Sequence, residues 1–381
     1  MTDRLNMEKP GRRLYADQVF IACTFLLTGI GLVTLYSSSF AFANSFFDDG
    51  YYFISRQLRL GILGICLFIT AAFIPLNFLR KAVFFMVLGT VALCVLTFVP
   101  GVGTAKNGAS RWISIGNSSY QPSELVKVIL PLYLAHIFDK KQKQIDSFAR
   151  GVLPPAMITS LFFVLISLQN NFSTALFIAL NGIFIFLMAG VKLRYFFGAA
   201  MILLPVSTLL ILSKEHRLRR FISYFWPDWE PLGAGYQVRS SRLTIGSGGF
   251  WGKGIGQGTK KIASVPEIQS DFIFSSYAEE FGYVGVLLFF IIFAVFAYRG
   301  YRAALHSEDV FRRLLAFGLV TMICFQVLVN IAVVSGTLPA TGIPLPFFSA
   351  GGSSLATTLI MAGLITNVSR HKKEPEVSFA P

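Results

Sequence analysis

Long uncharged apolar stretches recur along the whole chain, separated by short polar or charged connections. About 20 apolar residues are enough to cross a membrane as a helix. The uncharged run from Gly151 to Val191 is too long for one crossing, and Gln169, Asn170 and Asn171 in its middle predict a tight helical hairpin. In all, the pattern predicts ten transmembrane helices, at 18–40, 57–75, 82–100, 121–138, 152–169, 172–190, 195–213, 273–298, 312–334 and 352–369.

Composition supports this all-α integral membrane fold, which we expect to form one polytopic domain over residues 1–381. Hydrophobic residues make up 54% of the chain and charged residues only 14%, with a mean hydropathy of +0.63. A soluble domain carries about 25% charged residues. The net charge of +14 could indicate nucleic-acid binding, but the Lys and Arg residues cluster at the ends of apolar segments. They therefore fit membrane-flanking loops, and we expect no nucleic-acid partner.

The distribution of Lys and Arg predicts the side of the membrane that each connection occupies. Cytoplasmic loops carry an excess of these residues. They are concentrated in the tail 1–16, in the tail 370–381 and in alternate connections such as 140–150, whereas 335–351 contains none. With ten helices, both tails are expected in the cytoplasm, and the largest connection, 214–272, is expected outside the cell.

Two charged residues near the outer end of the fourth predicted helix are three positions apart. Glu124 and Lys127 therefore lie on one face of that helix. Charged side chains within a membrane are costly and usually face a partner or a wet cavity. The two residues form either a structural ion pair or part of a cavity wall that organises a site, and we favour a supporting role.

Asp271 stands at the outer mouth of the eighth predicted helix, after Pro266 and Glu267. Two interpretations fit this position. A carboxylate at the border of a low-dielectric region suits a general base. Aspartate is also favoured as a helix N-cap, because its side chain accepts a backbone hydrogen bond. Glu279 and Glu280 lie about two turns deeper and require partners or a polar cavity.

A glycine-rich run, Gly246–Gly258, contains Lys253 but matches no nucleotide-binding pattern. It is either a flexible or tightly turning loop, or a loop whose N–H groups and lysine approach a phosphate. Basic residues at the start of the same connection, including Arg217 and Arg220, either anchor the chain to lipid headgroups or clamp a pyrophosphate. The sequence has no HExxH metal motif, and its four histidines are scattered.

Seven short motifs together resemble the SEDS family, the FtsW/RodA/SpoVE group of cell-wall polymerases. They occur in that family's order over about residues 17–370, on the sides of the membrane that the topology requires. The motifs are Tyr36-Ser-Ser-Ser39; Asn107-Gly-Ala-Ser-Arg-Trp-Ile113; Gln121-Pro-Ser-Glu-Leu-Val-Lys127; Trp226-Pro-Asp-Trp-Glu-Pro-Leu-Gly-Ala-Gly-Tyr-Gln237; Ile245-Gly-Ser-Gly-Gly249; Pro266-Glu-Ile-Gln-Ser-Asp-Phe-Ile-Phe274 with Glu279-Glu280; and Thr341-Gly-Ile-Pro-Leu-Pro-Phe347 with Ser349-Ala-Gly-Gly-Ser-Ser354.

The resemblance implies a reaction. Members of the family polymerise lipid II, an undecaprenyl-pyrophosphate-linked disaccharide-pentapeptide, outside the membrane. The reaction resembles an inverting glycosyl transfer, and the family's essential carboxylate falls on Asp271. The family's Glu/Lys pair falls on Glu124 and Lys127. The residues expected to bind substrate are Glu124, Lys127, Arg217 and Arg220, together with Arg111, Lys253, Glu267 and Ser353.

The resemblance also implies partners. A single-pass class B penicillin-binding protein would supply the transpeptidase, and other divisome membrane proteins are expected beside it. A divalent cation, Mg²⁺ or Mn²⁺, on the pyrophosphate would be consistent with family behaviour, although no ligand set for it is legible in the sequence. Tyr36-Ser-Ser-Ser39, the stretch 51–57 and Gly235-Tyr-Gln237 are more similar to FtsW than to RodA. We therefore expect septal synthesis at the inner membrane, and a RodA-like elongation polymerase is the nearest alternative.

Two departures from the family pattern affect the expected site. Asn171 stands where the family usually has an acid, and Gln269-Ser270 replaces its His-Thr, so a histidine assisting Asp271 cannot be assumed. Two other functions stay open. A flippase for lipid-linked sugars would line its path with polar residues within the membrane, whereas a division scaffold would tolerate changes at Asp271.

Overall fold

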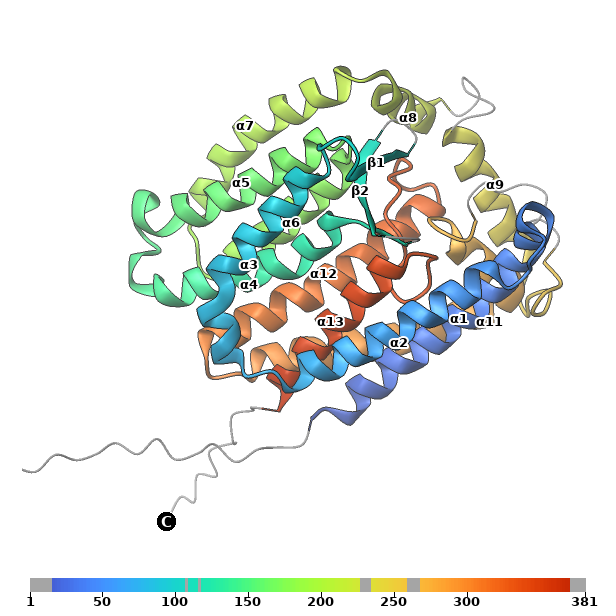
Figure 1. Cartoon of the computed structure of the whole chain (residues 1–381), viewed down its shortest axis with the longest axis horizontal. Helices are drawn as coiled ribbons and strands as arrows, with labels where there is room; N and C mark the ends of the chain where they lie inside the picture. Colours follow the sequence, from blue (N-terminus) through green and yellow to red (C-terminus); the bar gives the residue numbers. More distant parts are fainter. Residues whose placement is uncertain (1–15, 107–108, 116–117, 227–233, 259–267, 371–381) are drawn as a thin grey trace, which may run out of the picture.

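Helices occupy each of the ten predicted stretches. The computed structural model describes residues 16–106, 109–115, 118–226, 234–258 and 268–370. Figure 1 shows the helices side by side in one bundle. They are α1 (Gln18–Phe47), α2 (Tyr52–Phe73), α3 (Leu76–Leu96), α4 (Pro122–Lys140), α5 (Leu153–Leu168), α6 (Phe172–Met188), α7 (Leu193–Leu212), α11 (Ile273–Leu305), α12 (Val310–Val334) and α13 (Gly352–Ser369).

A multi-helix membrane protein is therefore confirmed. Within the described ranges, seven helices are long and apolar enough to span a membrane: α1, α2, α3, α5 with the π-helical turn η2 (Phe148–Val152) before it, α7, α11 and α12. The apolar helix α6 has only 17 residues. α4 carries Glu124 and Lys127, and α13 is rich in small polar residues. Length and composition thus support seven of the ten predicted crossings directly.

Several predicted boundaries were wrong. α1 continues to Phe47 rather than ending at 40, and α11 continues to Leu305 rather than 298. Both helices extend because the apolar pattern marks only the part of a helix inside the lipid. The predicted hairpin is confirmed: α5 ends at Leu168, α6 begins at Phe172, and Asn170 turns the chain with φ 59.

The connections contain structure that the apolar pattern did not predict. Two helices, α8 (Glu215–Phe225) and α9 (Ala234–Ser247), lie within the predicted loop 214–272. A small antiparallel sheet joins α3 to α4, with strands β1 (Gly103–Lys106), β2 (Ala109–Ile115) and β3 (Ser118–Tyr120) in the order β1-β2-β3. The sheet, α8 and α9 gather toward one end of the bundle (Figure 1). A short 3-10 turn, η1 (Gln142–Gln144), lies between α4 and η2.

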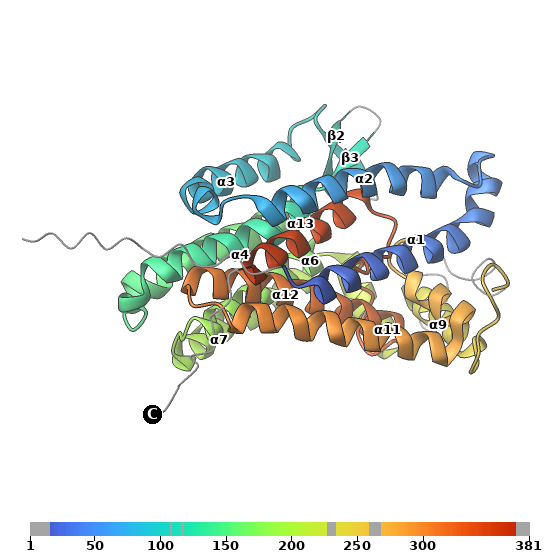
Figure 2. The same ribbon diagram turned by 90° about the horizontal axis from the view of Figure 1, so that it is seen from below.

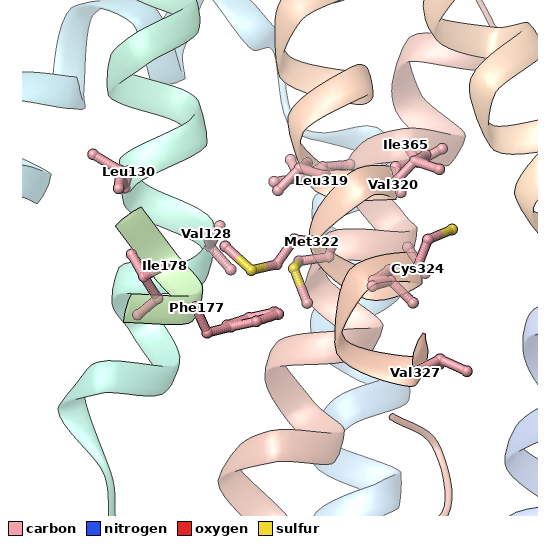
Figure 3. Close-up of a cluster of buried hydrophobic side chains, with 14 of the residues drawn as sticks. Val128, Leu130, Phe177, Ile178, Leu319, Val320, Met322, Cys324, Val327 and Ile365 are labelled. Atoms are coloured by element: carbon pink, nitrogen blue, oxygen red, sulfur yellow. The ribbon is translucent and has the colours of Figure 1, made fainter. Parts of the chain in front are cut away.

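The centre of the bundle is formed by α12, whose most apolar stretch is 72% buried. It packs against α4, α6, α11 and α13, while α2 runs along α13 (Figure 2). The α2–α13 contact is close because Gly363 has no side chain: a Cβ there would lie 2.5 Å from the carbonyl oxygen of Phe68. Small residues permit this kind of approach between membrane helices. Figure 3 shows the interlocking side chains of the central core, among them Val128, Phe177 and Met322.

Candidate active site

Five of the predicted site residues line one cavity. Its volume is about 700 Å³. Its walls come from β2, the start of α4, the turn between α5 and α6 with the start of α6, the segment before α8 with α8 itself, the segment before α11, and the loop before α13 with the start of α13. The predicted residues that line it are Arg111, Glu124, Arg220, Asp271 and Ser353. The sequence motifs thus converge in space although more than 240 positions separate Arg111 from Ser353 (353 − 111 = 242).

Asp271 lies beside the loop between α12 and α13. A Cβ built on Gly342 of that loop would be 3.3 Å from Oδ2 of Asp271. The N-cap of α11 is Phe272, which makes no side-chain capping hydrogen bond. Asp271 therefore precedes the cap position, and the alternative that it serves as the N-cap of this helix is wrong. Its carboxylate lines the cavity instead.

The loop between α12 and α13 is fastened to the segment that carries Asp271. The hydroxyl of Ser349 donates to the carbonyl oxygen of Ser270 at 2.6 Å, and the backbone N–H of Ala350 donates to that of Gln269 at 2.8 Å. Asn330 of α12 donates from Nδ2 to the carbonyl oxygens of both Asp271 and Ile343, each at 2.8 Å. One buried amide therefore ties Asp271 to the loop between α12 and α13.

Glu124 and Lys127 form the predicted ion pair. Nζ of Lys127 lies 2.7 Å from Oε1 of Glu124, and the two residues are 1% and 3% exposed. Lys127 also donates to Oε1 of Gln326 at 3.1 Å, and Nε2 of Gln326 donates to the carbonyl oxygen of Pro344 at 2.8 Å. The pair thus supports the loop before α13 through Gln326. Glu124 reaches the cavity surface, whereas Lys127 lies behind it.

Arg111 owes its position to an irregularity in the sheet. Thr104 pairs with Trp112 and Ala105 pairs with Ser110, so Arg111 is an extra residue on β2. Such a bulge redirects side chains, and both Arg111 and Trp112 line the cavity. The guanidinium of Arg111 donates to the carbonyl oxygen of Asn170 in the α5–α6 turn.

Other polar residues of the cavity were not predicted to bind substrate. Asn171 is 4% exposed, and its Nδ2 has no hydrogen-bond partner among the described residues. A buried amide without a partner is costly, and Asn171 is one of the residues that line the cavity. Lys214, just before α8, also lines the cavity. Behind the wall, burial and then the charge of Glu124 raise the pKa of Tyr120 to about 12.

Besides Lys127, which lies behind the wall, three predicted residues are not placed in the cavity. Glu267 and the side chain of Arg217 lie outside the part of the chain that the structure describes. Lys253 belongs to a separate cluster, in which its Nζ lies 3.1 Å from Oε1 of the buried Glu279. The expected phosphate-binding role of Lys253 therefore finds no support in the geometry, because this lysine already neutralises a buried acid.

The glycine-rich loop forms a clamp around the kink of α11, and we call this arrangement the glycine clamp. It consists of residues 247–256 with Glu279, Glu280 and Gly282. At Gly282 the helix is interrupted (φ 64, ψ −163), and the N–H groups of Tyr283 and Val284 donate to the carbonyl oxygens of Gly249 and Phe250. Glu280 accepts from Ser37 and from the N–H of Gly256. Glu279 thus has a cationic partner in Lys253, whereas Glu280 is held by hydrogen bonds to one of its two carboxylate oxygens.

No group of three His, Cys, Asp or Glu side chains able to hold a metal occurs in the described ranges. Of the two acids that line the cavity, Glu124 is already paired with Lys127. The described residues therefore do not supply a metal cage, and any Mg²⁺ or Mn²⁺ would depend on oxygen ligands of a substrate, as Mg²⁺ commonly does.

Fold and site together define a polytopic membrane protein with a polar, partly cationic cavity at one end of its helices and a carboxylate in the wall. Residues 17–374 match the FtsW/RodA/SpoVE family model, described as "Cell cycle protein", and the chain belongs to this family. It is 38% identical over 357 residues to a protein of Geobacter metallireducens named "Probable peptidoglycan glycosyltransferase FtsW", covering 94% of this chain and 95% of that one. Stage V sporulation protein E of Bacillus subtilis is 37% identical, with 94% and 98% covered.

Solved structures agree with this assignment. A chain from a study titled "Structural coordination of polymerization and crosslinking by a peptidoglycan synthase complex" superposes with a TM-score of 0.78 at 27% identity, covering 93% of this chain and 98% of that chain. The rod shape determining protein RodA of Thermus thermophilus superposes with a TM-score of 0.69 at 26% identity, covering 94% and 98%.

Proposed function

We propose that this protein is a peptidoglycan glycosyltransferase that polymerises lipid II. The observation that carries the proposal is the common cavity of Asp271, Arg111 and Arg220, which combines a carboxylate with cations suited to a pyrophosphate. The relatives named as glycosyltransferases support the same reaction. In the reaction, a sugar hydroxyl of the acceptor attacks the anomeric carbon of the donor, and the undecaprenyl pyrophosphate leaves.

Asp271 is the proposed general base. The acceptor hydroxyl is a weak nucleophile at neutral pH and must lose its proton as the glycosidic bond forms. A positioned base contributes about 10²–10⁴ in rate. Arg111, Lys214 and Arg220 would hold the leaving pyrophosphate, and Asn171 and Ser353 would donate or accept hydrogen bonds at the sugars.

The site is better suited to transfer than to translocation. The polar cavity lies where α5 meets α6 and where α7 ends, at one end of these helices. A flippase requires a polar path through the middle of the membrane. The names of the most similar relatives favour FtsW-type septal synthesis over RodA-type elongation. A class B penicillin-binding protein is the proposed partner, which fits the synthase complex among the structural relatives.

The proposed orientation has the cavity outside the inner membrane and both tails in the cytoplasm. The basic connections 140–150 and 299–313 support it through the positive-inside rule. In a variant without the native cysteines, Ser45→Cys should react with an impermeant maleimide in spheroplasts. Lys143→Cys should react only after permeabilisation. Labelling of Lys143→Cys in intact spheroplasts, with Ser45→Cys labelled only after permeabilisation, would disprove the proposed orientation.

Asp271→Asn tests the catalytic assignment, because it keeps the size of the side chain and removes its basicity. We expect the variant to fold, to retain its penicillin-binding partner and to make at least about a hundredfold less glycan from lipid II. Asp48→Asn is the matched control. Asp48 is exposed, and its backbone at the end of α1 has a left-handed conformation, which asparagine tolerates. Near-normal polymer from Asp271→Asn would disprove the assignment.

A further inference from the structure

A second cavity lies at the other end of α5, α6 and α7. Its volume is about 460 Å³, and it is lined by the beginning of α5, the end of α6 and the first half of α7. The active-site cavity touches the opposite ends of the same helices, at Asn170, Asn171 and Lys214. With the active site outside, this second cavity faces the cytoplasmic leaflet. We call it the inner cavity.

The inner cavity is apolar except at one end. Phe163, Phe186 and Ile202 are among its apolar lining residues, and Arg194 is its one charged lining residue among those described. No carboxylate lies within ion-pair distance of Arg194 in the described chain. The nearby Asp146 pairs with Lys192 instead, at 2.8 Å. The guanidinium of Arg194 donates to the hydroxyl of Tyr195 at 2.9 Å. Asp146 also attracts Arg194, so two cations, Lys192 and Arg194, share one carboxylate and leave an excess of positive charge here.

The helix α7, which forms one side of this cavity, is itself not covered by the rest of the described chain. None of the apolar stretch of α7 is buried within the protein, in contrast to 72% for α12. Figure 1 shows α7 at the edge of the bundle, beside α5. An apolar cavity that opens at membrane depth holds lipid rather than water, and its size is within the ~300–1,000 Å³ of small-molecule sites. A basic group at the cytoplasmic end of such a cavity selects an acidic headgroup.

We propose that the inner cavity binds one anionic glycerophospholipid of the cytoplasmic leaflet. Its phosphate is held by Arg194, and an acyl chain lies between α7 and the α5–α6 hairpin. This inference goes beyond glycosyl transfer and rests on the proposed orientation. The excess positive charge of Lys192 and Arg194 beside the single carboxylate of Asp146 favours an anionic lipid over a partner's apolar helix, which would bring no negative group to it.

Lipid binding to the purified, delipidated full-length protein tests the proposal by native mass spectrometry. We expect phosphatidylglycerol to bind about fivefold more tightly than phosphatidylcholine, the effect of one cation at a headgroup. Arg194→Gln should abolish this preference, because it should weaken the binding of phosphatidylglycerol more than that of phosphatidylcholine, whose phosphate is already balanced by its own choline cation. Arg302→Gln, an exposed cytoplasmic-side arginine at the end of α11, should retain it.

A second variant tests the place of the acyl chain. Gly198 lines the inner cavity, and a Cβ there meets no atom within 4 Å, so a Gly198→Leu side chain starts in open space and occupies part of the cavity. We expect it to weaken binding of both lipids, whereas Gly29→Leu on α1, where the space is equally open, should not. Equal binding of the two lipids by the wild type, competition by inorganic phosphate alone, or a partner helix cross-linked into the cavity would each overturn the proposal.

Discussion

The side-chain amide of Asn330 donates a hydrogen bond to the backbone carbonyl oxygen of Asp271 at 2.8 Å and a second one to that of Ile343. Asn330 is 1% exposed and does not line the active-site cavity, so it positions the proposed base without touching substrate. The position of the proposed base therefore depends on a residue in the last two turns of α12.

Asn330→Ala should lower kcat for lipid II polymerisation as well as thermal stability. Two buried carbonyl groups would lose their donor, at about 1–3 kcal/mol each, and Asp271 would lose its alignment. Asn181→Ala is the matched control, since Asn181 is equally buried but makes one long bond, 3.4 Å, to the carbonyl of Gly318, away from the cavity. Equal losses of kcat in the two variants would show that Asn330 has only a structural role.

The buried pair of Glu124 and Lys127 should be mutually dependent. Removing one partner leaves an uncompensated buried charge, which costs about 3–5 kcal/mol. Glu124→Ala should therefore lower the yield of folded protein and the unfolding temperature. The exchange Glu124→Lys with Lys127→Glu should recover part of the yield, but not all of it, because Gln326 receives its hydrogen bond from Lys127. Wild-type thermal stability in both single variants would contradict this prediction.

Two adjacent arginines on α8 should differ in function. Arg220 lines the active-site cavity, whereas Arg219 pairs with Glu215 at 2.6 Å on an exposed surface. Arg220→Ala should raise KM for lipid II about tenfold or more, since a charge-assisted phosphate contact contributes about 1.5–3 kcal/mol. Arg219→Ala should leave KM unchanged, because an exposed pair contributes little. Initial rates over a range of lipid II concentrations give the KM of each variant. Identical KM values for the two variants would show that Arg220 does not bind the substrate.

The glycine clamp should not tolerate a side chain at the kink of α11. Gly282 has φ 64, and a Cβ there would lie 2.2 Å from the backbone nitrogen of Gly252. The backbone conformation alone costs about 1–3 kcal/mol for other residues, so Gly282→Ala should reduce thermal stability and folded yield. Gly29→Ala introduces the same methyl group in open space on α1 and should be neutral. A stable, active Gly282→Ala protein would show that the clamp is dispensable.

Sequence patterns predicted best what depends on local spacing. The helices follow from long apolar runs, the ion pair from the three-residue spacing of Glu124 and Lys127, and the α5–α6 turn from Gln169, Asn170 and Asn171. Asp271 was singled out because it precedes a helix at the membrane border. These features arise from neighbouring residues, so the sequence contains their signal directly.

Features that depend on contacts between distant residues were missed. Lys253 was expected to approach a phosphate, but the kink at Gly282 brings its loop to Glu279. The strands near Arg111 are short and polar, and their pairing carries no apolar alternation that would reveal them. Asn330 and Gln326 lie within an apolar helix. Their role depends on the fold of the loop before α13, which no local pattern specifies.

The order in which the cavity walls occur along the chain constrains when the protein can become active. Wall residues extend from Ala109 on β2 to Ser354 at the start of α13, in a chain of 381 residues. A ribosome-bound chain therefore lacks one wall of this cavity until α13 has been synthesised and has entered the membrane. Premature termination before α13 would leave the cavity without the wall that Ser353 and Ser354 form, so we expect such a truncated protein to be inserted but inactive.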